Sequence, residues 1–409
     1  MDRKTLSWCL FDFANSSYSA VIAAVLFPVY YTSIIVGNGA GQGDVWWGRA
    51  ISVSMAAVAV SSPFLGGIAD YARLRKKLLF VYTFLCICAV AALFFLRPGM
   101  VLEGFLLIVL ANIGLEGGLV FYNAFLPEIA APAFRGRVSA WGYGVGYAGS
   151  ILSLLIALLL VKAGLLPLVW PMVALFFAFF SLPAFLFLPG DSGRGGKMLP
   201  ASLNGLLQTV RLLKQIGADR ERRRFLLAYF LYEDGVNTVI VFSSIFAAVT
   251  LHFSPEGLVL LYLVVQCTAL AGAFLMARFI DFRGPREVLV LSLLLWTAVA
   301  AAAFFVQEKT QFLLLAAVAG LGLGTVQASS RAFYAQYVPE GREAEYFGVY
   351  SLAGKSSAVL GPLVFGYISS SFGSQRPAVL SVALFFLAGL ALIGRTRGGG
   401  PNVRSEDGR

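Results

Sequence analysis

Charged side chains stand inside otherwise apolar stretches of the sequence at six positions. They are Asp12, Glu116, Glu233, Asp234, Arg331 and Lys355. Each charge facing lipid would cost about 2.5–3.5 kcal/mol, so six would cost roughly 15–20 kcal/mol, more than the whole stability of a typical domain. We therefore expect these side chains to face the interior of a helix bundle or a water-filled cavity, where they can bind a polar solute or transfer protons.

Four of the charged residues are expected at similar depths. Asp12 and Asp234 each follow a basic residue by eight to ten positions, which at 1.5 Å per residue places them roughly 12–15 Å from that side of the membrane. Glu116 and Lys355 lie near the middle of their apolar stretches. The four positions converge on one layer, and secondary transporters bind their substrates in such a layer near the bilayer midplane.

A polar stripe accompanies the first of these charges. The residues at i, i+3, i+4 and i+7 are Asp12, Asn15, Ser16 and Ser19. They share one face of a helix, which we interpret as a cavity wall. The asparagines also have a structural interpretation, as hydrogen-bonding groups that hold helices together. This alternative applies to Asn15, Asn112, Asn123 and Asn237, and Gln327 completes the polar candidates.

The balance of charge suggests a coupling mechanism. Four carboxylates face two cations, and burial near like charges favours the protonated form of a carboxylate. The only histidine, His252, lies at an outer helix end, so we expect carboxylates to transfer the proton. Glu233 and Asp234 point in different directions, and only one of them needs to face the cavity. Lys355 either neutralises one of these two acids or contacts the solute, and Arg331 is a candidate gate residue.

The elements that position these residues are membrane helices. The chain has 409 residues, of which 59% are hydrophobic and 13% are charged, with a mean hydropathy of +0.81. Soluble domains contain about a quarter charged residues, so the composition predicts an integral membrane protein. Apolar windows long enough to span a bilayer number twelve. They cover about 7–36, 46–69, 78–96, 104–126, 137–161, 167–188, 225–250, 256–279, 288–306, 312–337, 345–371 and 377–394.

The basic residues predict the orientation. Of 31 Lys and Arg residues, 24 fall on the side of the N-terminus and two lie within helices. The predicted outer loops contain Arg49, Arg97, Lys162, Lys309 and Arg376. Because basic residues concentrate in cytoplasmic loops, both termini are expected in the cytoplasm, and the protein in the cell membrane.

The chain divides at its longest polar stretch. We predict an N-terminal six-helix bundle over 1–190, a cytoplasmic linker over 191–224, a C-terminal six-helix bundle over 225–395 and a disordered tail over 396–409. Within the linker, apolar residues at helical spacing predict an amphipathic helix, which either lies on the membrane surface or packs on the bundle. These residues are Leu203, Leu206, Leu207, Val210, Leu213 and Ile216.

The two halves repeat in the same order. "LFDFANS" (10–16) matches "YEDGVNT" (232–238), "GGIADYARLRKK" (66–77) matches "ARFIDFRGPRE" (277–287), and "FYNAFLPE" (121–128) matches "FYAQYVPE" (333–340). Three pairs at similar offsets indicate a parallel six-plus-six repeat. This is the architecture of the major facilitator superfamily.

The motifs resemble this superfamily and one of its subgroups. "GGIADYARLRKK" is similar to the loop motif between helices 2 and 3, and Asp70 and Arg73 match its charged pair. The resemblance implies that Asp70 braces a cytoplasmic gate through an ion pair and a facing helix end. The second copy keeps Asp281, Gly284 and Arg286. "WCLFDFANSSYS", "YEDGVNT" and the segment from "GTVQASS" to "AVLGP" resemble the unknown major facilitator family, whose eukaryotic relatives are autophagy-related vacuolar effluxers linked to amino-acid release. In the superfamily, helices 1, 4, 7 and 10 line the central cavity.

Other readings of the sequence are weaker. "GVGYAG" (144–149) matches a dinucleotide-binding pattern but lies within a membrane helix, so close helix packing explains it better, as it does "GLGLG" (320–324). The cysteines show no pairing or CxxC pattern, so we expect neither disulfides nor a metal site. We also expect no cofactor, no nucleic-acid partner and no enzymatic activity.

The combined features predict a transporter of small solutes. Our first hypothesis is a monomeric, proton-coupled secondary transporter that moves a small polar solute, such as an amino acid, by alternating access. A zwitterion needs both acids and bases in the site, and the intramembrane residues supply both. The alternatives are a transporter that exports lipophilic cations, favoured by the acidic excess and the many aromatic residues, and a membrane sensor on the same fold that does not transport.

Overall fold

The computed structural model describes residues 2–37, 42–191, 210–249, 251–253, 255–358, 364–365, 368, 372 and 375–396, and its assigned elements are helices. The first half contains α1 (Arg3–Ser17), η1 (Tyr18–Val25), α2 (Phe27–Tyr30), η2 (Tyr31–Val36), α3 (Gln42–Ala72), α4 (Arg75–Ala92), η4 (Leu93–Phe95), α5 (Val101–Ala124), α6 (Leu126–Ile129), η5 (Pro132–Phe134), α7 (Arg135–Lys162), η6 (Leu166–Leu168) and α8 (Val169–Phe187). The second half contains α10 (Arg220–Val249), α11 (Pro255–Arg283), α12 (Pro285–Ala303), α13 (Lys309–Tyr334), η7 (Ala335–Tyr337), α14 (Glu343–Ser357) and α16 (Gln375–Gly394).

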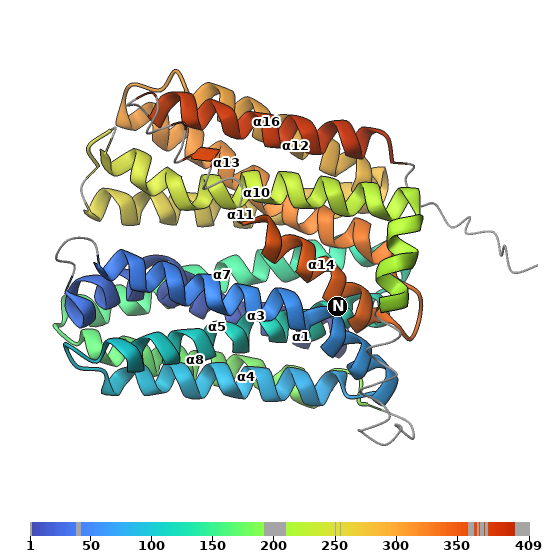
Figure 1. Cartoon of the computed structure of the whole chain (residues 1–409), viewed down its shortest axis with the longest axis horizontal. Coiled ribbons are helices and arrows are strands. Elements are labelled where there is room, and N and C mark those ends of the chain that lie inside the picture. The colour runs from blue at the N-terminus through green and yellow to red at the C-terminus, as the bar shows by residue number, and fades with distance from the viewer. Residues whose placement is uncertain are drawn as a thin grey trace, which may run out of the picture.

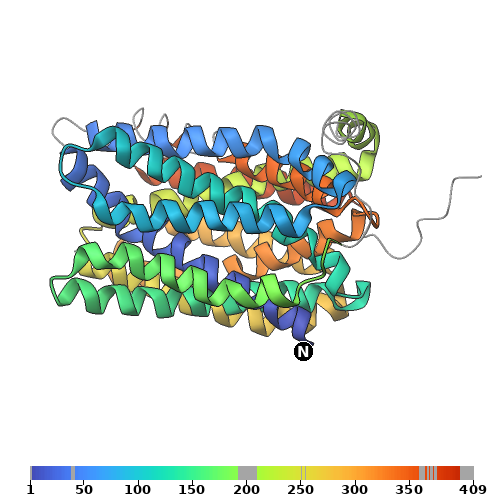
Figure 2. The ribbon, with the colours of Figure 1, turned by 90° about the horizontal axis from the view of Figure 1, so that it is seen from below.

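The long helices form two bundles, one from each half of the chain, and run along the longest axis of the molecule (Figures 1 and 2). The bundles meet where α3 packs along α14 and where α7 packs along α11. In both pairings the second long helix of one half contacts the fifth long helix of the other, as the parallel repeat predicts. We call the end at which the N-terminus lies the inner end, because the basic residues predict it to be cytoplasmic.

The predicted membrane segments correspond to helices. Among the described residues, nine helices are long and apolar enough to cross a membrane, and the bent first segment adds a tenth. The other two predicted segments are represented by α10 and α14. Helix α10 begins at Arg220 with a basic first turn, inside the range assigned to the linker, and much of the segment predicted after Ser357 lies outside the described residues.

The first membrane segment is not the single continuous helix that the sequence predicts over 7–36. It bends by 42° between Arg3–Val25 and Phe27–Val36. In the π-helical stretch η1 the hydrogen bonds reach one residue further, and at its end the Leu26 amide donates to the Val21 carbonyl at 3.0 Å. Pro28 follows, and it has no N–H to continue the helix and crowds the carbonyl four residues earlier. These two features explain the break.

The glycine-rich stretches allow close helix packing, as predicted. A Cβ atom on Gly149 of α7 would lie 2.1 Å from the Phe13 carbonyl oxygen of α1. Likewise, a Cβ atom on Gly324 of α13 would lie 2.1 Å from the Ala269 carbonyl oxygen of α11. No side chain fits at either distance, so glycine lets these backbones touch. The dinucleotide pattern is therefore a packing pattern.

The linker helix packs on the bundle through a different residue from the one predicted. Residues 210–218 are helical and run across the inner ends of the long helices (Figure 1). Leu212 and Ile216 are buried, whereas Val210 and Leu213 are 39% and 37% exposed. Leu212 thus replaces Leu213 in the buried stripe, because Leu212 and Ile216 are spaced at i, i+4. The predicted positions 203–207 lie outside the described residues.

Candidate functional site

An arginine of the second bundle lies inside the first bundle. Arg331 of α13 is 1% exposed. Its Nε donates to Ser139 Oγ at 2.9 Å, its Nη2 to the Ser139 carbonyl oxygen at 2.7 Å, and its Nη1 to Asn123 Oδ1 at 3.2 Å. A carboxylate oxygen of Asp12 lies 3.6 Å from Nη1. Each nitrogen of the guanidinium group therefore has a partner, and the contacts connect α13 with α1, α5 and α7.

Aromatic rings complete the surroundings of this guanidinium group. Its central carbon lies 4.0 Å from the ring centroid of Tyr143, 4.6 Å from that of Trp8 and 5.9 Å from that of Tyr122. Such distances favour cation–π attraction. We call the set that surrounds Arg331 the arginine cage. It consists of Trp8, Asp12, Tyr122, Asn123, Ser139 and Tyr143.

The cage is held by contacts within the first bundle. Trp8 and Tyr122 stack with centroids 4.6 Å apart, Trp8 Nε1 donates to the Tyr122 carbonyl at 3.0 Å, and the Tyr122 hydroxyl donates to the Trp8 carbonyl at 3.1 Å. The Asn15 amide donates to Asp12 Oδ1 at 3.3 Å. A Cβ atom on Gly142 would lie 2.9 Å from both Arg331 Nη2 and Asp12 Oδ2. Glycine at position 142 therefore leaves room for the buried ion pair.

A second ion pair joins the two bundles deeper in the molecule. Lys355 Nζ of α14 contacts Glu116 Oε2 of α5, and Lys355 also interacts electrostatically with Glu233 of α10. The expectation that Lys355 pairs with Glu233 or Asp234 is therefore incomplete, because the contact within ion-pair distance is to Glu116. The reason is the helix arrangement, in which α14 packs against α5 as well as α10.

The remaining polar candidates differ from one another in burial and in hydrogen-bond partners. The Asn112 amide donates to Ser54 Oγ at 2.7 Å, which joins α5 to α3 and fits the structural interpretation of this asparagine. The Tyr147 hydroxyl donates to Gln327 Oε1 at 3.3 Å, across the two bundles. Asp234 is completely buried, Asn237 is partly exposed and Ser19 is exposed. The stripe on the first helix therefore divides, with Asp12 and Asn15 buried and Ser19 exposed.

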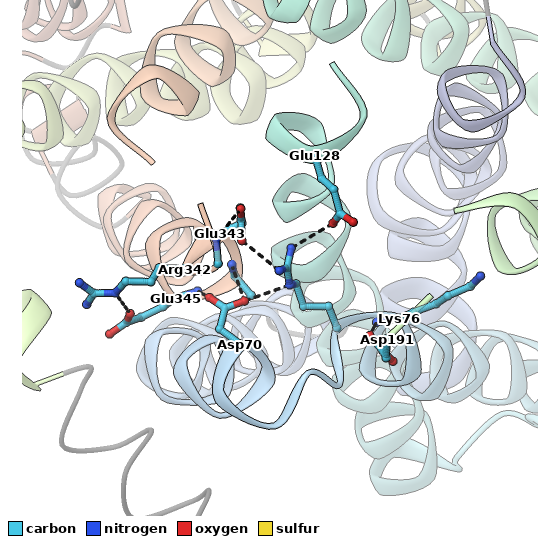
Figure 3. Close-up of polar contacts among 10 residues, drawn as sticks. Asp70, Lys76, Glu128, Asp191, Arg342, Glu343 and Glu345 are labelled. Carbon is cyan, nitrogen blue, oxygen red and sulfur yellow. Dashed lines mark hydrogen bonds and ion pairs between the residues drawn. The ribbon is translucent and has the colours of Figure 1, made fainter. Parts of the chain in front are cut away.

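The inner ends of the two bundles are joined by an aspartate at a helix N-terminus. Asp70, near the end of α3, accepts from the backbone amides of Ala344 and Glu345 at 3.2 and 2.9 Å (Figure 3). These amides belong to the first turn of α14, where unpaired N–H groups and the helix dipole favour an anion. The facing helix end implied by the family resemblance is therefore present in the structure.

The ion pair at this position involves Arg75 rather than Arg73. Arg75 Nε lies 3.0 Å from Asp70 Oδ1, Nη2 lies 3.0 Å from Glu343 Oε2, and Nη1 lies 3.3 Å from Glu128 Oε2. The cluster draws on α3, α4, α6 and α14, and its carboxylates can be followed in Figure 3. One guanidinium group thus bridges three carboxylates.

The backbone explains why the arginine that pairs with Asp70 lies two residues after the one that the sequence motif matched. Arg73 has a φ of 52°, and the bonds from the Leu74 amide to the Ala69 carbonyl and from the Arg73 amide to the Asp70 carbonyl form the Schellman motif that ends α3. The chain reverses at Arg73, so Arg75, the first residue of α4, lies beside Asp70.

The second copy of the motif joins α11 to α7. Asp281 Oδ1 accepts from the Arg137 amide at 2.9 Å, and Asp281 Oδ2 lies 3.2 Å from Arg137 Nε. Arg286, expected to act in gating, instead donates from Nη2 to the Gly394 carbonyl at 2.9 Å. That contact joins α12 to α16 within one bundle, since the side chain at the start of α12 points to the neighbouring helix end.

Sequence reasoning missed the aromatic part of the cage and both arginines that pair with the aspartates. Weak signals were present. Trp8 precedes Asp12 by four residues, which places both on one helix face. Arg75 follows Asp70 at the same interval as Arg286 follows Asp281. Arg137 could not be found in this way, because its partner belongs to the other half of the chain. Within the described residues, no group of three His, Cys, Asp or Glu side chains could hold a metal ion.

The fold is that of the major facilitator superfamily, and the family and relatives reported below identify the chain as a multi-pass membrane transporter of this superfamily. Among solved structures, the human organic anion transporter MFSD10 matches with a TM-score of 0.78 and 16% identity, over 96% of this chain and 99% of that one. At this identity the match concerns the fold alone.

The family follows from the sequence comparisons. The chain belongs to the family described as vacuole effluxer Atg22 like, whose model matches residues 48–397. An uncharacterized MFS-type transporter of Bacillus subtilis, YxiO, is 29% identical over 95% of this chain and 93% of its own length. Autophagy-related protein 22-1 of Penicillium rubens is 26% identical over 84% of this chain and 73% of its own length.

Proposed function

We propose that this transporter is a proton-coupled secondary transporter that moves a small polar solute, with amino acids as the favoured class, by alternating access. The observation that carries the proposal is the buried ion pair between Asp12 and Arg331, which joins one bundle to the other. Burying charges costs free energy. At an interface between bundles that separate during the transport cycle, such charges can drive the conformational change. The solute would occupy the space between the bundles.

The inter-bundle contacts support an alternating-access cycle. They run from the inner end, where Asp70 and Asp281 contact opposing helices, to the middle of the molecule, where Glu116 meets Lys355. With these contacts formed, the inner end is closed, and the space between the bundles would open towards the outer end. Opening inwards requires the bundles to separate along this whole line. The working unit would be one chain in the cell membrane, with both termini in the cytoplasm.

The two central carboxylates are the proposed coupling groups. Asp12 and Glu116 each contact a cation from the opposite bundle. A proton on either carboxylate removes the negative charge that attracts this cation, and so weakens the contact between bundles. Proton binding and bundle separation are thereby linked, as reciprocal coupling between two equilibria requires. Asp234, the repeat partner of Asp12, is a further candidate.

The experiment uses the purified protein in proteoliposomes with an imposed pH gradient and a mixture of labelled amino acids. We expect gradient-driven uptake in the wild type, and its loss in Glu116→Gln and in Asp12→Asn, with solute exchange at equal pH retained in at least the former. Asp234→Asn is measured in parallel. Glu103→Gln is the matched control, because Glu103 lies on the same helix α5 but is exposed. Uptake with an unchanged pH profile in the Asp12, Glu116 and Asp234 variants would refute carboxylate coupling.

A further inference from the structure

The side chains that hydrogen-bond to the Arg331 guanidinium group, pair with it or stack on it come from the bundle to which Arg331 does not belong. Trp8 and Asp12 lie on α1, Tyr122 and Asn123 on α5, and Ser139 and Tyr143 on α7. Arg331 itself lies on α13. The arginine cage is therefore a binding site of the first bundle, and in this state its occupant is a side chain of the second bundle.

The cage matches the chemistry of a guanidinium group in particular. Its three oxygen acceptors and the Asp12 carboxylate meet N–H groups that point in different directions in one plane. Its rings offer π faces at 4.0 and 4.6 Å from the central carbon. A guanidinium group presents five donors in a fixed planar fork and stacks on aromatic rings, whereas an ammonium group is a compact point charge.

Separation of the bundles would empty this site. Arg331 moves with α13 when the inner end opens, while the cage stays with α1, α5 and α7. Asp12, only 6% exposed, would then lose the cation that it faces, and an uncompensated buried charge is strongly destabilising. A proton could neutralise Asp12, but it would fill neither the space beside the rings nor the acceptors of Asn123 and Ser139.

We infer that the arginine cage is a solute site, which binds the guanidinium group of a cationic solute when the inner end is open and is occupied by Arg331 when the inner end is closed. The chain's own arginine and the solute thus compete for one site. Because Arg331 and the solute cannot occupy the cage together, the solute must leave the cage when the inner end closes. The inference rests on the proposed alternating access, and it names the solute class as small molecules with a guanidinium group.

The first test replaces the internal occupant. Arg331→Ala leaves the cage empty, and thermal unfolding of the purified variant is followed with methylguanidinium or with methylurea, which has nearly the same shape but no charge. We expect methylguanidinium at millimolar concentration to raise the melting temperature of Arg331→Ala by a few degrees, because a ligand that binds the folded state stabilises it. The wild type, whose cage is full, should show no shift.

The matched control for this test is Arg137→Ala. Arg137 also lies between the bundles and stacks on an aromatic ring, that of Phe134, at 5.2 Å, but its side chain is 31% exposed. Methylguanidinium should not stabilise this variant. Equal stabilisation of Arg331→Ala by methylurea, or no stabilisation by either compound, overturns the inference.

The second test needs no variant at position 331 and so remains decisive if Arg331→Ala does not fold. Counterflow of labelled arginine and labelled citrulline, its neutral isostere, is measured with the wild type and with Tyr143→Leu. We expect arginine to be exchanged at least tenfold faster than citrulline, and Tyr143→Leu to raise the half-saturation concentration for arginine. Equal rates overturn the inference. So does a protein that transports another solute in the pH-gradient assay but neither of these two, and that result leaves the proposed transport function standing.

Discussion

At the inner end, the two copies of the motif make the same kind of contact, but the helix ends that their aspartates meet carry opposite charges. Asp70 of α3 accepts from two amides in the first turn of α14, and Asp281 of α11 accepts from the Arg137 amide in the first turn of α7. The repeat that relates these helices also relates their first residues. However, α14 begins with Glu343 and Glu345, whereas α7 begins with Arg135 and Arg137. One aspartate faces an acidic helix end and the other a basic one.

This difference explains why the copies use different arginines. Asp281 finds its cation on the helix that it contacts, because Arg137 supplies both an amide and a guanidinium group. Asp70 cannot do so, and its cation, Arg75, comes from its own bundle and also neutralises Glu343 and Glu128. A helix N-terminus contributes about 0.3–1 kcal/mol, and up to about 2 in partly buried geometry. Two charges 4 Å apart interact with about 4 kcal/mol at an effective dielectric constant of 20. The ion pair with Arg75 therefore contributes more to the stability of the contact at Asp70 than the helix N-terminus does.

Among the substitutions at the inner end, Arg75→Gln should have the strongest effect on the distance between the bundles. The substitution leaves three carboxylates from three elements close together without their bridging cation. Removal of one partner from a buried ion pair typically costs about 3–5 kcal/mol, so we expect the closed inner end to lose most of its population. Spin labels at Lys77 and Glu340, both exposed, should report a longer distance between the bundles.

The control for Arg75→Gln is acidification. Protonation of one carboxylate removes like-charge repulsion, so lowering the pH should restore part of the short distance in Arg75→Gln. A distance distribution identical to that of the wild type at neutral pH would show that the three-carboxylate cluster does not depend on Arg75.

A smaller effect is expected from Asp70→Asn. The asparagine keeps one acceptor oxygen for the amides of α14 but has no charge to interact with the helix end or with Arg75. The like-charge cluster is relieved at the same time, because Arg75 then faces only Glu343 and Glu128. We expect a loss of about 1–2 kcal/mol, seen as a mixed population of short and long distances between the same labels. A complete opening would mean that Asp70 contributes more than its contacts indicate.

The second copy should respond less than the first. Arg137 is 31% exposed at its side chain, and Asp281 retains the backbone amide at position 137 when the side chain changes. For Arg137→Gln we therefore expect a loss of about 1 kcal/mol or less. Labels at Ala133 and Phe282, exposed positions beside the contact, should show nearly the wild-type distance. If this variant opens the inner end as far as Arg75→Gln does, the proposed asymmetry of the two copies is wrong.

The sequence predicted the parts of this arrangement that depend on composition and periodicity. The membrane helices follow from composition, and the repeat of the two halves follows from the three matched motifs. The cost of charges in lipid places Asp12, Glu116, Arg331 and Lys355 inside the bundle. Partners were harder to predict, because helix faces fix a direction but not the neighbouring helix. Lys355 was expected either to neutralise an acid of α10 or to contact the solute, yet its ion pair is with Glu116 of α5.

Local backbone conformation limited the prediction at the inner end. The family resemblance matched Asp70 and Arg73 to the charged pair of the motif. An uninterrupted helix would place both on one face. The chain instead leaves the helix at Arg73, where φ is 52°, and such a reversal is expected mainly at glycine. The second copy has this glycine, Gly284 with φ of 86°, and so the repeat contained the information that the first copy lacks.

A substitution at Arg73 tests this explanation directly. Arg73→Gly should raise the stability of the protein by about 0.5–1 kcal/mol, because a non-glycine residue in the left-handed region costs about 1–2 kcal/mol and the greater backbone entropy that glycine loses on folding offsets about 0.5–1 kcal/mol of this. The substitution should leave the short distance between Lys77 and Glu340 unchanged, since the ion pair of Asp70 is with Arg75. Ala72→Gly, one position earlier and within the helix, is the matched control and should lower stability by about 1 kcal/mol. Thermal unfolding and the spin-label distance measure both effects, and a longer distance in Arg73→Gly would return Arg73 to the role that the motif first suggested.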